Sequence, residues 1–122
     1  MNKFSFVLLY VDSPQASATF YADLLGTPVI ENSPTFAMLP LNGAVMLGLW
    51  SRRTVEPVAS APGGGEIAFT AADADAVEQT HADWKKRGLP IAQPPTAMDF
   101  GHTFVALDPD GHRLRVLAPA VA

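Results

Sequence analysis

At 122 residues the chain has the length of one small domain, and its 48% hydrophobic and 16% charged residues exclude the composition of a disordered protein. The net charge of −4, with no basic cluster, argues against nucleic acid as a partner. The sequence contains no cysteine, which excludes disulfides, thiolate metal sites and a cysteine nucleophile.

The N-terminal residues predict a first β-strand rather than a targeting or membrane segment. An apolar run over residues 4–11 is rich in aromatic and branched side chains and ends at Asp12-Ser13-Pro14, with no small-residue cleavage site. The run is also too short to span a bilayer. We therefore expect a cytoplasmic protein with no membrane partner.

The rest of the first half predicts one helix and three short strands. Asp12 or Ser13 can cap the helix, Pro14 suits its first turn, and Gly26 is a natural stop. The strands are expected over residues 28–30, 35–41 and 43–50, with a Pro-Leu-Asn-Gly turn between the last two.

The second half begins after a segment rich in proline and glycine, residues 51–66, which is typical of a linker. A strand over residues 66–71 is followed by a helix over 74–88 that Asp73 or Asp75 can cap. A strand over 90–92, a Pro94-Pro95 loop and a final hairpin around Asp108-Pro109-Asp110-Gly111 complete the chain.

The two halves match in the order of their elements, so the chain is predicted to be an internal repeat of two βαβββ units. The fold class is α+β, in which two tandem modules form a cupped, incomplete barrel-like mixed sheet with the helices outside. We expect a single domain with module one at 1–60, a linker at about 56–65 and module two at 65–122. The concave face of the sheet is where a ligand would bind.

Side-chain alternation assigns the final hairpin's residues to two faces. If residues 108–111 form a four-residue loop, Leu107 opposes His112 and Phe104 opposes Arg115. The face expected to pack on a helix then carries Thr103, Val105, Leu107, Leu114 and Val116. The face expected in the concavity carries His102, Phe104, Ala106, Arg113, Arg115 and Leu117.

Alternation in the first strand of each unit supplies further candidates for a ligand site. In the first strand Phe6 and Tyr10 lie away from the helix, and Glu66 does so at the start of the second unit. Trp50 is expected at the rim of the cup, and Phe36, Met38 and Met46 are expected among its apolar residues. The candidates for ligand binding are Trp50, Arg115, His102, Phe104, Phe6, Tyr10, Glu66, Met38 and Met46. For each apolar residue simple core filling is the alternative, and for Trp50 the alternative is a subunit interface. Arg115 could bind a ligand carboxylate or carbonyl, or it could form an internal salt bridge with Glu66, and the two roles are compatible because a ligand could share or displace Glu66.

The repeated βαβββ unit, the opening VDSPQASATFYADLLG and the ending DPDGHRLRVL resemble the vicinal oxygen chelate superfamily, which includes glyoxalase I, extradiol dioxygenases and bleomycin-resistance proteins. The segments MLGLWS, EIAF, DADAVEQTHADWKK and DFGHTFVALDPDGHRLRVLAP look like its phenazine-antibiotic-resistance branch. That branch binds a planar tricyclic antibiotic without a metal. The resemblance also implies a homodimer. The Gly63-Gly64-Gly65 hinge would permit the two chains of such a dimer to exchange a module.

Metal-using members of the superfamily hold a divalent ion with side chains from four strand positions. By the resemblance these positions are Phe6, Glu66, Arg115, and Leu47 or Gly48, of which only Glu66 could be a ligand. We therefore expect no metal, no cofactor and no catalytic residues. The predicted function is metal-independent sequestration of a planar aromatic compound, with resistance to a phenazine- or bleomycin-type antibiotic. The alternative is a glyoxalase-like lyase or isomerase, or a dioxygenase-related enzyme.

Overall fold

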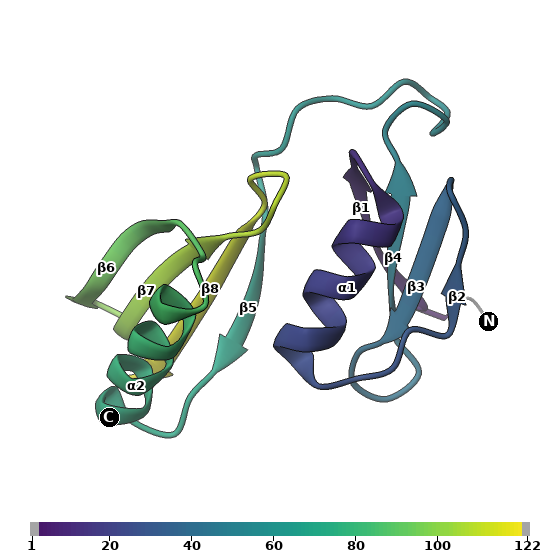
Figure 1. Cartoon of the computed structure of the whole chain (residues 1–122). Helices are drawn as coiled ribbons and strands as arrows, with labels where there is room; N and C mark the ends of the chain where they lie inside the picture. Colours follow the sequence, from purple (N-terminus) through teal and green to yellow (C-terminus); the bar gives the residue numbers. More distant parts are fainter. Residues whose placement is uncertain (1–2, 121–122) are drawn as a thin grey trace. The chain divides into compact units, whose positions relative to one another are not determined.

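The computed structural model describes residues 3–120 and shows two compact units, Met1–Ala61 (unit 1) and Pro62–Ala122 (unit 2). Each unit contains one helix and one four-stranded sheet (Figure 1). Within the described residues, neither helix has the length and apolar character needed to cross a membrane.

Unit 1 is built in the order strand, helix and three strands. The elements are β1 (Phe6–Val11), α1 (Pro14–Leu25), β2 (Glu31–Asn32), β3 (Phe36–Pro40) and β4 (Met46–Ser51). The sheet order is β1-β4-β3-β2, in which β1 and β4 are parallel and the other pairs are antiparallel. Ser13 caps α1 by accepting a hydrogen bond from the Ala16 N–H, and Gly26 ends the helix at a φ of 67°.

Unit 2 repeats this order. Its elements are β5 (Glu66–Thr70), α2 (Ala74–Lys86), β6 (Ile91–Met98), β7 (Gly101–Leu107) and β8 (Arg113–Pro119). The sheet order β5-β8-β7-β6 is equivalent to that of unit 1, again with one parallel pair, β5 with β8. Asp73 caps α2 through the Ala76 N–H. The prediction of an α+β fold with two βαβββ modules is confirmed.

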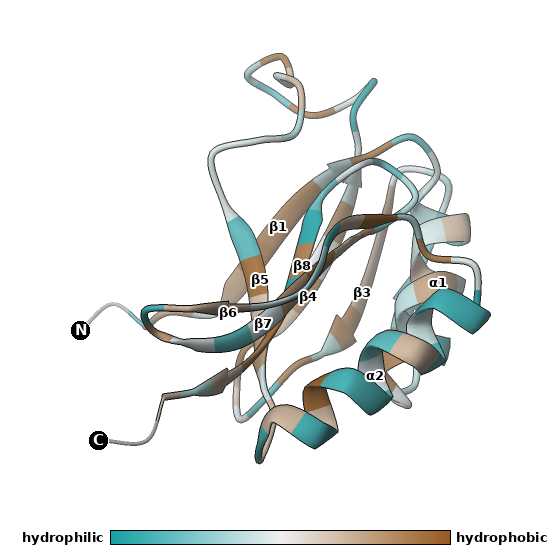
Figure 2. Cartoon of the chain, turned by 90° about the vertical axis from the view of Figure 1, so that its left-hand side faces the viewer, coloured by the Kyte–Doolittle hydropathy of each residue, from teal (hydrophilic) through white to brown (hydrophobic). Residues whose placement is uncertain are grey.

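In each unit the core lies between the helix and one face of the sheet. Tyr21 and Ala18 of α1 are fully buried, as are Leu39, Leu47 and Leu49 of the sheet. In unit 2, Trp84 of α2 makes edge-to-face contacts with Phe69 and Phe104, at centroid distances of 5.9 and 5.4 Å. Figure 2 shows the corresponding pattern of hydropathy: β1 is predominantly hydrophobic, whereas α2 alternates between hydrophilic and hydrophobic residues. In the part of the chain that the structure describes, the opposite face of each sheet has no helix of its own unit against it.

Two of the predicted elements are wrong in position. The strand expected over residues 28–30 is instead β2 at Glu31–Asn32, and the Pro94-Pro95 segment expected as a loop lies inside β6. β6 is an edge strand, and its register with β7 shifts between Ile91 and Gln93 and between Gln93 and Thr96. Edge position and irregular pairing accommodate residues that have no N–H to donate.

The predicted register of the last hairpin is wrong by one residue on β7. Leu107 pairs with Arg113, so five residues rather than four separate the strands, and Phe104 pairs with Val116 while Val105 pairs with Arg115. The Asp108 carboxylate accepts hydrogen bonds from the N–H groups of both Asp110 and His112, which holds His112 in the loop. The faces of β8 are as predicted, but those of β7 are exchanged.

Candidate functional site

The face of the unit 1 sheet opposite to α1 carries large apolar side chains arranged in three rows across the strands. The register places Phe36, Trp50 and Tyr10 in one row, and Pro40, Met46 and Phe6 in another. The row between them runs Glu31, Met38, Gly48 and Leu8. A residue without a side chain therefore lies in the middle of this face.

The neighbours of Gly48 close over its main chain, so a side chain at this position would have to displace them. A Cβ atom added there would lie 2.5 Å from Leu8 Cδ2 and 3.0 Å from Phe36 Cζ, both closer than ordinary van der Waals contact. Leu8 and Phe36 thus fill the space of the missing side chain from opposite sides. Together they form the floor of a depression in the sheet.

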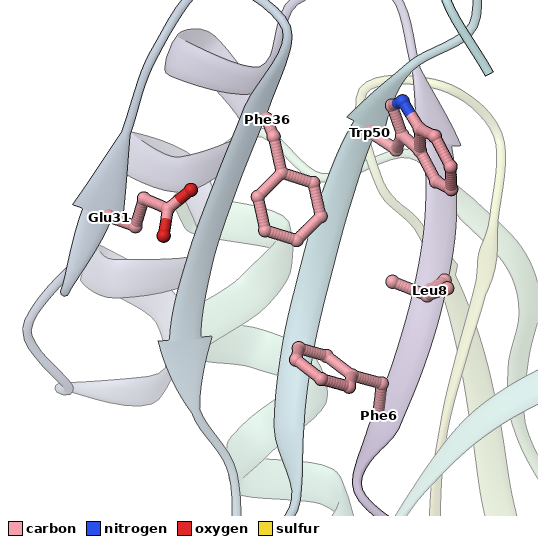
Figure 3. A pocket seen from close by; sticks show the side chains of 5 residues that line it. All are labelled: Phe6, Leu8, Glu31, Phe36 and Trp50. Carbon is pink, nitrogen blue, oxygen red and sulfur yellow. The ribbon is translucent and has the colours of Figure 1, made fainter.

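This depression, hereafter the aromatic hollow, has a volume of about 380 Å³ and is lined by Phe6, Leu8, Glu31, Phe36 and Trp50 (Figure 3). The volume is within the range of small-molecule sites in proteins. The rings of Phe36 and Trp50 meet edge to face, with a centroid distance of 6.5 Å and an angle of 86°. Phe6 and Leu8 keep 42% and 44% of their surface exposed, so apolar surface remains available to a ligand.

Among residues 3–120, Glu31 is the one charged residue in the lining of the aromatic hollow. It comes from the two-residue edge strand β2, and Figure 3 shows its carboxylate extending from β2 toward β3 and Phe36. The sequence prediction missed this residue because the strand was expected three residues earlier. Glu31 reaches this face through its pairing with Met38 of β3, a register that the local sequence does not show.

The predicted candidates in unit 1 share the correct face, but only some of them line the aromatic hollow. Phe6 and Trp50 line it. Tyr10, Met38 and Met46 lie on the same face by register but outside the lining. Phe36, which was expected in the apolar cup, and Leu8, which was not among the candidate ligand-binding residues, complete the hollow.

In unit 2 the guanidinium of Arg115 is held by a set of polar side chains, hereafter the Arg115 cluster. Its Nε and Nη2 donate to the two carboxylate oxygens of Glu66, at 2.8 and 3.0 Å. Its Nη1 donates to Gln93 Oε1 at 3.2 Å and to Thr103 Oγ1 at 3.1 Å. The cluster therefore connects all four strands of the sheet. The internal salt bridge with Glu66, one of the two compatible roles expected for Arg115, is present.

The Arg115 cluster changes the acidity of Glu66. Hydrogen bonding to Arg115 is the main cause that lowers the pKa of the Glu66 carboxyl from its ordinary value of 4.5, and partial desolvation opposes this effect. Arg113, whose Nη1 lies 3.7 Å from Glu66 Oε2, lowers the pKa further. The carboxylate is therefore ionised and paired at neutral pH.

His102 and Phe104 do not lie beside Arg115, as the predicted register required. Phe104 is fully buried against α2, where its ring contacts those of His81 and Trp84. His102 Nε2 lies 2.7 Å from Glu78 Oε2 of α2. The face that carries Arg115 instead presents Thr103 and Val105, which follows from the five-residue loop between β7 and β8.

The residues at the positions that metal-using relatives employ do not fit a divalent ion. Glu66 is the only carboxylate among them, and a bidentate ion pair with Arg115 occupies both of its oxygens. Phe6 and Gly48 offer no ligand atom in their side chains. Within residues 3–120, moreover, no group of three or more His, Cys, Asp or Glu side chains is placed to hold a metal ion.

Comparisons with known proteins agree with this fold. The sequence profile of the Glyoxalase/Bleomycin resistance protein/Dioxygenase superfamily matches residues 3–116. The phenazine antibiotic resistance protein EhpR of Enterobacter agglomerans is 31% identical over 113 residues, which cover 89% of this chain and 86% of that protein.

Two solved structures extend the comparison. Protein ATC0852 from Agrobacterium tumefaciens, determined by solution NMR, is 51% identical with a TM-score of 0.89, covering 99% of this chain and 100% of that chain. A glyoxalase-related enzyme from Fulvimarina pelagi has a TM-score of 0.82 at 21% identity, covering 97% and 88% of the two chains, and this likeness concerns the fold alone. The chain belongs to the Glyoxalase/Bleomycin resistance protein/Dioxygenase superfamily.

Proposed function

We propose that the chain is a metal-independent binding protein that sequesters a planar aromatic compound in the aromatic hollow. The observation that carries the proposal is the composition of that hollow, in which four of the five lining residues are apolar and three of these are aromatic. A flat aromatic ligand should bind such walls more favourably than other apolar ligands, because stacked and edge-to-face contacts add binding energy to that of burying apolar surface.

The relationship to a phenazine antibiotic resistance protein supports an antibiotic as the compound that is bound. A phenazine is a flat, fused tricyclic ring system, and this shape suits a shallow site between aromatic side chains. Sequestration needs no chemical step. The lack of fit to a metal, described above for Glu66 and its equivalents, agrees with a role in binding.

The test is equilibrium dialysis of the protein against phenazine, with the free ring measured by its absorbance. We expect saturable binding, and we expect Trp50→Ala and Phe6→Ala to weaken it about tenfold or more, because each removes a wall of the hollow. Phe100→Ala is the matched control for Phe6→Ala. The two phenylalanines are equally exposed, at 43% and 42%, but Phe100 does not line the hollow.

Two results would count against the proposal. If phenazine and related tricyclic rings fail to bind the folded protein, sequestration of planar compounds is wrong. If Phe100→Ala weakens binding as much as Phe6→Ala does, the aromatic hollow is not the site.

A further inference from the structure

We propose that Glu31 makes the aromatic hollow selective for planar aromatic cations over neutral rings, and for neutral rings over anions. This inference rests on the function proposed above and adds the charge of the ligand to it. It follows from the charges around the hollow and from the chemistry of its walls.

Within the described part of unit 1, residues 3–61, no group neutralises the negative charge of Glu31. Across residues 3–120, no hydrogen bond or ion pair engages the Glu31 carboxylate. Unit 1 contains three cationic side chains, Lys3, Arg52 and Arg53. The two arginines are engaged with Asp12, since Arg53 Nη1 donates to the Asp12 carbonyl oxygen at 2.9 Å and Arg52 Nη1 lies 3.7 Å from its carboxylate.

Because Glu31 lies beside apolar walls, its electrostatic interaction with a bound ring is stronger than it would be in water. A ring that enters the hollow displaces water from Phe6, Phe36 and Trp50, so the effective dielectric constant between the ring and Glu31 falls below that of bulk water. A cationic ring is then attracted more strongly than it would be in solution. An anionic ring would lose hydration next to a carboxylate that has no counter-ion.

The aromatic walls favour the same sign of charge through a second, independent term. The faces of tryptophan and phenylalanine rings carry negative electrostatic potential and attract cations. Three of the five lining residues are aromatic. Both effects therefore predict that a cationic ring binds most tightly, a neutral ring less tightly and an anionic ring least tightly.

A different role for Glu31 makes a different prediction. β2 is an edge strand, and a charged residue on an edge discourages pairing with other chains. That role requires a charge but not a negative one, so Glu31→Lys would satisfy it. Selectivity for cations, by contrast, requires the negative sign.

The experiment compares three probes that share one ring system: 10-methylphenazinium, phenazine and phenazine-1-carboxylate. Their affinities are measured at neutral pH by equilibrium dialysis with the full chain. For the unsubstituted protein we expect the methylphenazinium cation to bind most tightly and the carboxylate least. Glu31→Gln should weaken binding of the cation about three- to tenfold and leave neutral phenazine within about twofold.

Two further variants complete the test. Glu31→Lys should reverse the order of the cation and the anion. Asp23→Asn is the matched control, because it also removes one negative charge from unit 1 but lies on α1, which packs on the other face of the sheet. It should leave all three affinities within about twofold.

The outcomes separate this inference from the proposed function. Binding of phenazine with no preference among the three probes, or an equal response to Glu31→Gln and Asp23→Asn, would overturn the inference and leave the proposed function intact. Failure of all three probes to bind would overturn both.

Discussion

Replacing Arg115 with methionine should destabilise the fold by about 2 kcal/mol, a value between those of surface and buried ion pairs. Methionine keeps most of the apolar stem and removes the guanidinium, so the change isolates the polar contacts. Four hydrogen bonds are lost, two of them to the ionised Glu66.

The magnitude follows from the exposure of the partners. The side chains of Arg115 and Glu66 are 17% and 28% exposed, which is less than a surface pair and more than a fully buried one. Surface pairs contribute about 0–1 kcal/mol, and removing one partner of a buried pair costs about 3–5 kcal/mol. Water can reach Glu66 in the variant, and Thr103 keeps its hydrogen bond to the Val116 carbonyl oxygen, so the loss stays below the buried range.

The assay is urea unfolding followed by far-UV circular dichroism, with Arg113→Met as the matched control. Arg113 lies on the same strand, but its side chain is 59% exposed, and its Nη1 lies 3.7 Å from Glu66 Oε2, farther than the 2.8 Å between Arg115 Nε and Glu66 Oε1. Its loss should therefore cost less than about 0.5 kcal/mol. A double-mutant cycle of Arg115→Met with Glu66→Gln isolates the pair itself.

The same pair predicts a dependence of stability on pH. The pKa of Glu66 is lowered in the folded state, so its contribution is fully present above the ordinary value of 4.5 and is lost as the pH falls through the folded-state pKa. The difference between the unsubstituted protein and Glu66→Gln should therefore be constant near neutrality and shrink in acid. Equal losses for Arg113→Met and Arg115→Met, or a difference that grows in acid, would refute this reasoning.

Three further substitutions test other parts of the structure. Gly48→Ala should weaken phenazine binding several-fold, because the added methyl pushes Leu8 into the aromatic hollow, and equilibrium dialysis measures this. Trp84→Ala should lower the unfolding free energy by about 3–5 kcal/mol in urea titrations, because Trp84 is only 8% exposed in the core of unit 2. Asp73→Ala removes the cap of α2 and should cost about 1 kcal/mol by the same titration, whereas the neighbouring Asp75→Ala should cost less.

Much of the fold could be predicted because local signals determine it. The caps at Ser13 and Asp73, the stop at Gly26 and the alternation along β1 and β5 act within a few residues of the chain. β2 was misplaced for the opposite reason. A two-residue strand carries no periodicity, and its position depends on pairing with β3.

The candidate site was predicted in part because residues on one strand keep their relative faces whatever the register. Phe6 was therefore assigned correctly to the face opposite α1, and Trp50, which was expected at the rim of the cup, lies on that face as well. His102 and Phe104 were assigned to the wrong face of β7, because their face depends on the number of residues in the loop before β8. The Asp108 carboxylate sets that number through its hydrogen bonds to Asp110 and His112, and turn composition alone does not reveal it.

The two tryptophans of the chain fall one to each unit, Trp50 in unit 1 and Trp84 in unit 2. Trp84 is buried among other rings, whereas Trp50 is only half-buried, so their emission should differ in wavelength and in response to a quencher in solution. Single-tryptophan variants would then report each unit separately during unfolding. Coincident transitions would show that the two repeats unfold as one cooperative body, and separate transitions would give the stability of each repeat by itself.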